Sequence, residues 1–125
     1  MDEIEFYSEF REMVISKDLV AASATPLILS ILQEGQSYGY AIIGRVRELS
    51  NGRMQWTDGM LYPVLHRLEA QKLVKSRWSV SQTGRKRKYY RLTRRGMKVL
   101  QDSQSQWSLV YSTLRKLWRG KPCLT

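Results

Sequence analysis

Cations, rather than nucleophiles or metal ligands, are the side chains that could do chemistry in this chain. Its 125 residues include one histidine, His66, and one cysteine, Cys123. One residue of each kind supplies neither a metal-ligand set nor a nucleophile paired with a base, and a single cysteine allows no internal disulfide. Residues 44–52 and 83–90 combine glycine with arginine, but neither segment has the spacing of a phosphate-binding loop. The sequence therefore predicts no enzyme, no metal and no cofactor.

The positive charge is unevenly distributed along the chain. Lys and Arg number 21 against 11 Asp and Glu, which gives a net charge of +10. Residues 1–18 hold six acids and two bases, a net of −4, so the rest of the chain carries +14. Eight basic residues and no acid lie between Arg85 and Lys98. Such a cluster attracts a polyanion, of which nucleic acid is the commonest in a cytoplasm, although a merely solvated surface is the alternative.

Length and composition are those of a small globular protein. A chain of 125 residues with 42% hydrophobic content can build one core. No apolar run approaches the roughly 20 residues that span a bilayer, so no membrane association is expected. The acidic N-terminal segment differs from a secretory signal, and we expect a cytoplasmic location.

Residues 58–74 form the segment best suited to reach into a groove of DNA. The apolar residues Leu61, Val64, Leu65 and Leu68 make one stripe at helical spacing, and Thr57 can cap the helix. The opposite side is small and sparsely charged, with Gly59, Pro63, His66 and Ala70. A slim outer face of this kind can approach base edges closely. Alternatively, Gly59 and Pro63 only shape the turn.

The remaining pattern divides the chain into short elements. We expect an acidic amphipathic helix over 2–15 and a connector, partly helical, over 16–25. Thr25 and Pro26 resemble an N-cap and first helical residue, Ser37 can cap the next helix, and 53–56 reads as a short extended piece. Two strands, 73–80 and 86–92, are joined by a turn over 81–85, and Thr93 caps a last helix that runs to about Trp118.

This order of elements predicts an α+β fold that is mainly α. Three short helices followed by a hairpin are typical of the winged helix-turn-helix, whose third helix enters a DNA major groove. We expect an additional N-terminal helix and a long C-terminal dimerisation helix. The predicted parts are 1–22 (amphipathic helix and connector), 23–92 (DNA-binding domain), 93–120 (dimerisation helix) and 121–125 (tail).

Three segments resemble, in order and spacing, the hallmark segments of PadR-type transcriptional regulators. They are "SYGYAIIGRVRE", "DGMLYPVLHRLEAQKLV" and "GRKRKYYRLTRRG". The resemblance covers roughly residues 25–118 and is strongest to the branch with a single C-terminal helix. It implies a dimeric winged-helix repressor, and many members respond to small aromatic or drug-like effectors. The acidic helix over 2–15 is longer than the lead-in common in this branch.

The resemblance also implies which residues face DNA. They are Tyr38, Tyr40, Thr57, Tyr62, His66, Arg85, Lys86, Arg87 and Lys88. Arg67 is added because it lies at the edge of the same helix face and can reach a phosphate. Lysines and arginines of the hairpin would contact DNA phosphates, which position the protein but specify no sequence. Specificity is therefore expected from Tyr62 and His66 on the third helix. Tyr90 and Leu92 share a strand face that is expected to join the core.

The last helix has two overlapping apolar stripes that share Trp107 and Leu114. A face this broad suggests a second subunit, as the resemblance implies, although helix 2–15 could cover it within one chain. Trp107 could stack on a flat aromatic effector at the dimer interface, or it could only fill that interface. The residues predicted for the effector site or interface are Leu100, Ser103, Trp107, Val110, Tyr111 and Leu114.

The function predicted from these features is a sequence-specific DNA-binding regulator. We expect a homodimeric repressor on a palindromic operator, released by a small aromatic or drug-like effector. The alternative is a constitutive or architectural DNA-binding protein that senses no ligand.

Overall fold

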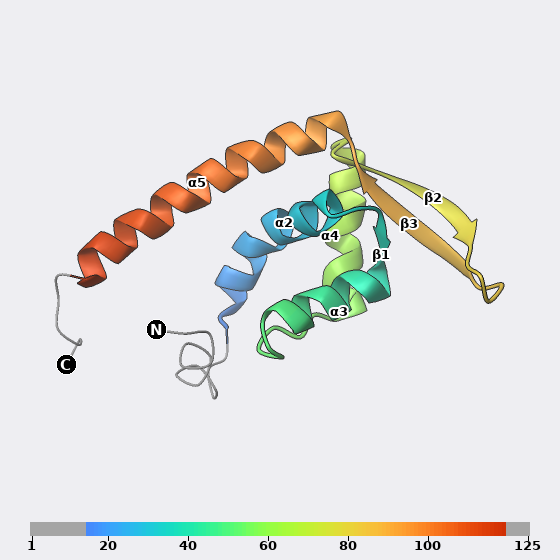
Figure 1. Cartoon of the computed structure of the whole chain (residues 1–125), viewed down its shortest axis with the longest axis horizontal. Helices are drawn as coiled ribbons and strands as arrows, with labels where there is room; N and C mark the ends of the chain where they lie inside the picture. The colour runs from blue at the N-terminus through green and yellow to red at the C-terminus, as the bar shows by residue number, and fades with distance from the viewer. Residues whose placement is uncertain (1–14, 120–125) are drawn as a thin grey trace.

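The computed structural model describes residues 15–119, a mainly helical fold with one small sheet (Figure 1). The winged helix-turn-helix prediction is confirmed. The expected helix 2–15, tail 121–125 and Cys123 lie outside the described residues. The elements are α2 (Lys17–Gln33), β1 (Ser37–Tyr38), α3 (Gly39–Leu49), α4 (Asp58–Ala70), β2 (Val74–Val80), β3 (Lys86–Leu92) and α5 (Arg94–Arg119).

The first described helix begins earlier than predicted. Ser16, not Thr25, is its N-cap, since the Ser16 hydroxyl accepts a hydrogen bond from the Leu19 N–H at 3.2 Å. Pro26 therefore lies inside α2 and removes one helical hydrogen bond. The carbonyl that loses this bond belongs to Ala22, an exposed residue that water can reach. The predicted helix start at Pro26 is wrong, and α2 runs across the predicted boundary between residues 22 and 23.

The third strand is also not where the sequence placed it. The short extended piece expected over 53–56 forms no strand; it is irregular and buries Trp56. Instead Ser37 and Tyr38 pair with Tyr90 and Tyr89 on β3, which gives the sheet the order β1-β3-β2. Because Ser37 is in this strand it does not cap α3, whose N-cap is Tyr38 without a side-chain bond.

The hairpin and the last two helices form as expected. β2 and β3 pair antiparallel from Val74↔Leu92 to Val80↔Lys86. Thr57 caps α4 by accepting from the Met60 N–H, and Thr93 caps α5 by accepting from the Gly96 N–H. These two threonines set the points at which α4 and α5 begin.

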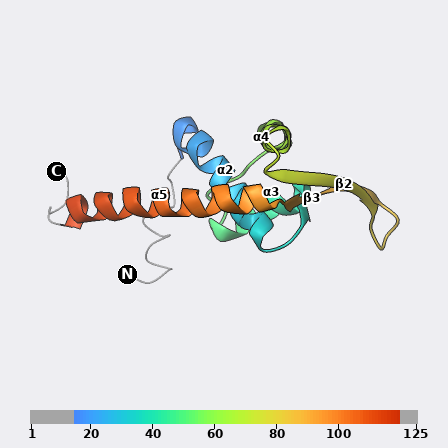
Figure 2. The same cartoon turned by 90° about the horizontal axis from the view of Figure 1, so that it is seen from above.

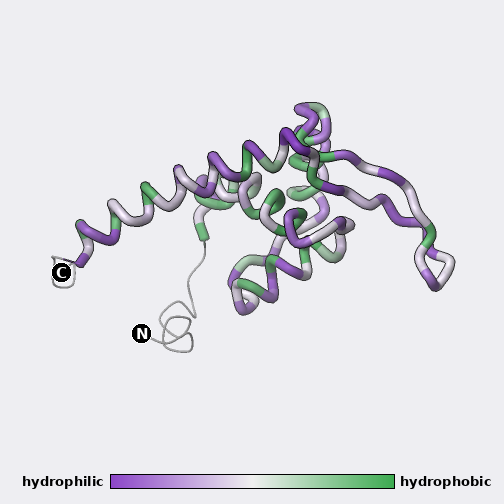
Figure 3. Tube along the Cα trace, turned by 45° about the horizontal axis from the view of Figure 1, so that its top comes forward, coloured by the Kyte–Doolittle hydropathy of each residue, from purple (hydrophilic) through white to green (hydrophobic). Residues whose placement is uncertain are grey.

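The core lies where α2, α3 and α4 meet the inner face of the sheet. The leucine stripe of α4 is buried, with Leu61, Leu65 and Leu68 at most 1% exposed. Tyr90 enters the same core from β3, which confirms the predicted face, and Leu100 enters it from α5. Figure 3 shows hydrophobic residues recurring along the helices that meet there. Burying one face of α4 leaves its other face outward.

An exposed ion pair links α3 to the end of α2. Arg45 on α3 bonds to Glu34, the C-cap residue of α2, at 2.7 Å, and to Glu48 at 3.2 Å. The hydrogen bond from Arg45 lowers the pKa of the Glu34 carboxyl, so this group stays charged at neutral pH.

The last helix leaves the domain after its first turns. α5 packs against α2 near its start and then projects beyond the rest of the fold (Figures 1 and 2). Its large apolar side chains are exposed there: Leu109, Val110, Tyr111, Leu117 and Trp118. Among the described helices, none combines the length and apolar character that a membrane crossing needs.

Candidate nucleic-acid interface

A cleft of about 770 Å³ lies between the outer face of α4, the start of α3 and the hairpin, hereafter the wing. α4 contributes Tyr62 and His66, whose rings lie 6.3 Å apart, because burial of the leucine stripe leaves the opposite side of the helix facing outward. The cleft gathers eight of the ten residues predicted to face DNA: Tyr38, Tyr40, Tyr62, His66, Arg85, Lys86, Arg87 and Lys88.

The cations of the wing are held by aromatic rings, not by carboxylates. The Arg87 guanidinium lies 4.4 Å from the centre of the Tyr38 ring, and the Lys86 Nζ lies 5.3 Å from that of Trp78. Both ion pairs among residues 15–119 belong to Arg45, so no carboxylate in that range pairs with a cation of the wing. A ring orients a cation without cancelling its charge, which leaves these groups available to an anion.

Two tyrosines fix the sheet beneath the cleft. Tyr89 meets Tyr38 edge to face with ring centres 5.4 Å apart, which ties β1 to β3. Tyr90 is fully buried, and its hydroxyl has no hydrogen-bond partner among residues 15–119. Burial raises the pKa of the Tyr90 hydroxyl above its ordinary value, so the group is neutral at physiological pH.

Gly39 allows Tyr62 to take its place in the cleft. Gly39 is buried at the start of α3, and a Cβ added there would overlap the Tyr62 hydroxyl and lie 2.8 Å from its Cζ. The phenol of Tyr62 therefore rests against bare backbone. Only glycine leaves this space open.

Two predicted contacts lie outside the cleft. Thr57 is exposed at the N-terminus of α4 and its hydroxyl is engaged in the cap. Arg67 turns towards α2, where its Nη2 donates to the Thr25 hydroxyl at 3.2 Å. Conversely, Gly39 and Trp78 line the cleft although the sequence did not single them out.

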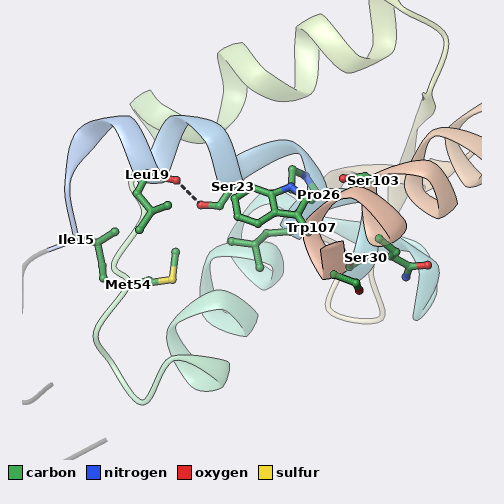
Figure 4. A pocket seen from close by; sticks show the side chains of 11 residues that line it. Ile15, Leu19, Ser23, Pro26, Ser30, Met54, Ser103 and Trp107 are labelled. Atoms are coloured by element: carbon green, nitrogen blue, oxygen red, sulfur yellow. Dashed lines mark hydrogen bonds between the residues drawn. The ribbon is translucent and has the colours of Figure 1, made fainter. Parts of the chain in front are cut away.

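A second, apolar groove of about 510 Å³ lies between α2 and α5 (Figure 4). Of the six residues predicted for an effector site or interface, Ser103 and Trp107 line it, with Leu19, Pro26 and Leu27 opposite on α2. Trp107 is 39% exposed. The other predicted residues divide: Leu100 is in the core, Leu114 is half-buried, and Val110 and Tyr111 are each 54% exposed.

Comparison with known proteins agrees with this geometry. Residues 28–102 match the model of the family described as "Transcriptional regulator PadR-like family". A transcriptional regulator from Clostridium thermocellum is 33% identical, with 82% of this chain and 97% of that chain covered and a TM-score of 0.74. A PadR-like regulator from Bacillus cereus is 28% identical, with 84% and 100% covered and a TM-score of 0.76. The Escherichia coli transcriptional regulator YqjI is 29% identical over 71% of this chain, which spans 41% of YqjI.

Proposed function

Because the chain belongs to the PadR-like family of transcriptional regulators, we propose that it represses transcription as a homodimer on a palindromic operator until a small aromatic effector releases it. Members of this family are regulators, not enzymes, in agreement with the sequence prediction. The observation that carries the proposal is the cleft. It brings side chains of α4 and cations of the wing to one concave surface.

The cleft suits a sugar–phosphate backbone. A B-DNA major groove is about 12 Å wide and admits an α-helix, so the outer face of α4 can enter it. The backbone that borders that groove then lies in the cleft, within reach of Lys86 and Arg87. Tyr62 and His66 lie on the face of α4 that would enter the groove, where hydrogen bonds to base edges would supply sequence preference.

The projecting half of α5 supports the homodimer. Its exposed apolar side chains would be covered by the same helix of a second copy, and a two-fold arrangement presents two α4 helices to DNA. Two such helices fit half-sites about 34 Å apart, one turn of the duplex.

The groove beside α5 supports the effector. Its volume of about 510 Å³ is that of a small-molecule site, and its lining is apolar around Trp107. A flat aromatic compound could stack on the indole. Binding there would reorient α5 against α2, and so change the spacing of the two α4 helices.

The deciding experiment titrates the full chain onto the DNA upstream of its own gene and onto random duplex, at several salt concentrations. We expect tighter binding to the upstream DNA and a footprint with two protected half-sites. Equal affinities for both DNAs would remove the sequence-specific regulator and leave an architectural DNA-binding protein.

Replacing Arg85, Lys86 and Arg87 together with alanine is expected to weaken binding to all duplexes alike. The slope of log affinity against log salt should fall by about one unit for each lost phosphate contact. Arg119→Ala, at the far end of α5, is the control and should leave the slope unchanged. An unchanged slope in the triple variant would show that the wing does not contact DNA phosphates.

Gly39→Ala is expected to displace Tyr62 from the cleft while the fold stays intact. The added Cβ meets the end of a side chain, not backbone, so Tyr62 can swing aside. Operator affinity should fall by about 1–2 kcal/mol, the size of one lost base-edge contact, while the melting temperature changes little. Tyr62→Phe is the matched comparison. It keeps the ring and removes only the hydroxyl, so it shows whether the hydroxyl makes the contact. If Gly39→Ala binds as tightly as the parent, Tyr62 makes no contact.

Trp107→Ala is expected to abolish effector sensing and to leave operator binding intact. Planar dyes should quench Trp107 fluorescence in a variant with Trp56, Trp78 and Trp118 replaced by Phe, and should release operator DNA from the parent. If no dye quenches and Trp107→Ala yields a monomer, Trp107 is only an interface residue.

A further inference from the structure

The wing carries two large apolar side chains that lie outside the core. Trp78 is 59% exposed and Val80 is 66% exposed, both on β2. They share a strand face with Val74, which is buried in the core. Near Val74 this face is buried in the core, whereas the hairpin extends past α4 beyond the core (Figure 1). Core packing therefore does not account for Trp78 and Val80.

Their surroundings point to a polyanion with an apolar component. Trp78 lines the cleft between α4 and the wing and stands opposite Lys88, while Val80 stands opposite Lys86. Lys86 also lies over the indole of Trp78. Two apolar groups on β2 thus stand opposite two cations on β3, on one face of the wing. Sugars offer an apolar surface beside phosphates, so DNA presents the matching chemistry.

We propose that Trp78 and Val80 pack against the deoxyribose walls of the minor groove next to the major groove occupied by α4, and that they favour A·T pairs there. The inference rests on the proposed DNA binding and extends it. With α4 in the major groove and the backbone in the cleft, the outer wing lies over the adjacent minor groove.

The width of that groove supplies the preference. A minor groove is about 6 Å wide, which admits side chains but not a β-ribbon. A-tracts narrow it further and bring the two sugar walls together, so apolar side chains contact both walls. A G·C pair adds an amino group to the groove floor. The wing would therefore sense groove shape, whereas its lysines and arginines only hold phosphates.

The test first selects a binding site from a random duplex library with the full chain. The selected core is then kept, and the base pairs under the wing are made A·T, G·C or inosine·C. Inosine keeps the major-groove edge of guanine and lacks its minor-groove amino group. We expect A·T and inosine·C flanks to bind alike, and G·C flanks about five- to tenfold more weakly, the cost of one mismatched pair.

Three variants assign the preference to the apolar face. Trp78→Ala should bind all three flanks equally, and Trp78→Phe should keep most of the discrimination. Lys86→Ala should weaken binding to every flank by the same factor. The melting temperature of each variant checks that the fold is intact. Replacing Trp78 should change it little, because this side chain is 59% exposed.

Two results would overturn the inference while the proposed function stands. One is a wild-type chain that binds the selected core tightly but is indifferent to the flanks. The other is a Trp78→Ala variant that retains the full A·T preference. A library selection that yields no site preferred over random DNA would instead overturn the proposed function itself.

Discussion

Val110→Asp is expected to convert the protein to a monomer and to lower its operator affinity towards the non-specific level, about a thousandfold or more. Val110 is 54% exposed, so the charge costs little in the isolated subunit. In the proposed dimer the same carboxylate would be buried against a second α5 without a partner, which costs several kcal/mol. A monomer presents one α4 helix and loses the second half-site.

Ser105→Asp is the matched control for this prediction. Ser105 is also exposed on α5, but it lies on the side of the helix away from Trp107 and Leu114. Both substitutions place aspartate within the same helix, so their effects on helix propensity are similar. Sedimentation should show a monomer only for Val110→Asp. If that variant stays dimeric with full operator affinity, α5 is not the dimer interface.

Elements defined by local signals could be predicted from the sequence. The leucine stripe of α4, the alternation of the hairpin and the capping threonines Thr57 and Thr93 all act within a few residues. In the structure α4, β2, β3 and α5 begin within a residue of their predicted starts, although α4 ends at Ala70 within the segment 58–74 that reads as helical. In each case the residues that decide the conformation are neighbours in the chain.

Elements that depend on residues distant in the sequence could not be predicted in this way. β1 is two residues long and exists because Tyr89 and Tyr90 pair with it from some fifty residues further along. Pro26 reads locally as the start of a helix, but the cap at Ser16 and the burial of Ala24 and Ile28 continue α2 through it. The sequence around a proline indicates the local backbone preference of that residue, but packing of the neighbouring side chains can continue a helix through it.

The same distinction divides the candidate site. Helical spacing placed Arg67 at the edge of the recognition face, but the Thr25 hydroxyl on α2 draws it away. Trp78 shares a strand face with the buried Val74, yet it is 59% exposed, so only the fold shows that the core does not reach it. The groove beside Trp107 likewise depends on α2, whose side chains complete it within one chain. Residue types predicted the chemistry of each surface, and tertiary contacts decided which residues share it.

Gly96→Ala is expected to destabilise the fold by about 2–3 kcal/mol, the upper range for overpacking a filled site. A Cβ at Gly96 would overlap the carbonyl oxygen of Leu73 and lie 2.9 Å from Leu92 Cδ1. Unlike a side-chain end, that carbonyl is fixed, because it accepts hydrogen bonds from the Thr93 N–H at 3.1 Å and the Thr93 hydroxyl at 3.0 Å. The clash therefore strains the junction between the hairpin and α5.

Gly44→Ala tests whether this loss comes from the contact and not from the change of residue. Gly44 lies inside α3, and a Cβ added there meets nothing within 4 Å. Alanine should stabilise that helix by about 0.5–1 kcal/mol, since glycine is the poorer helix former. Urea unfolding of the two variants should move in opposite directions. Because α5 begins at the strained junction, Gly96→Ala should also weaken the dimer. If it unfolds at the same urea concentration as Gly44→Ala, α5 does not pack on the hairpin as the structure has it.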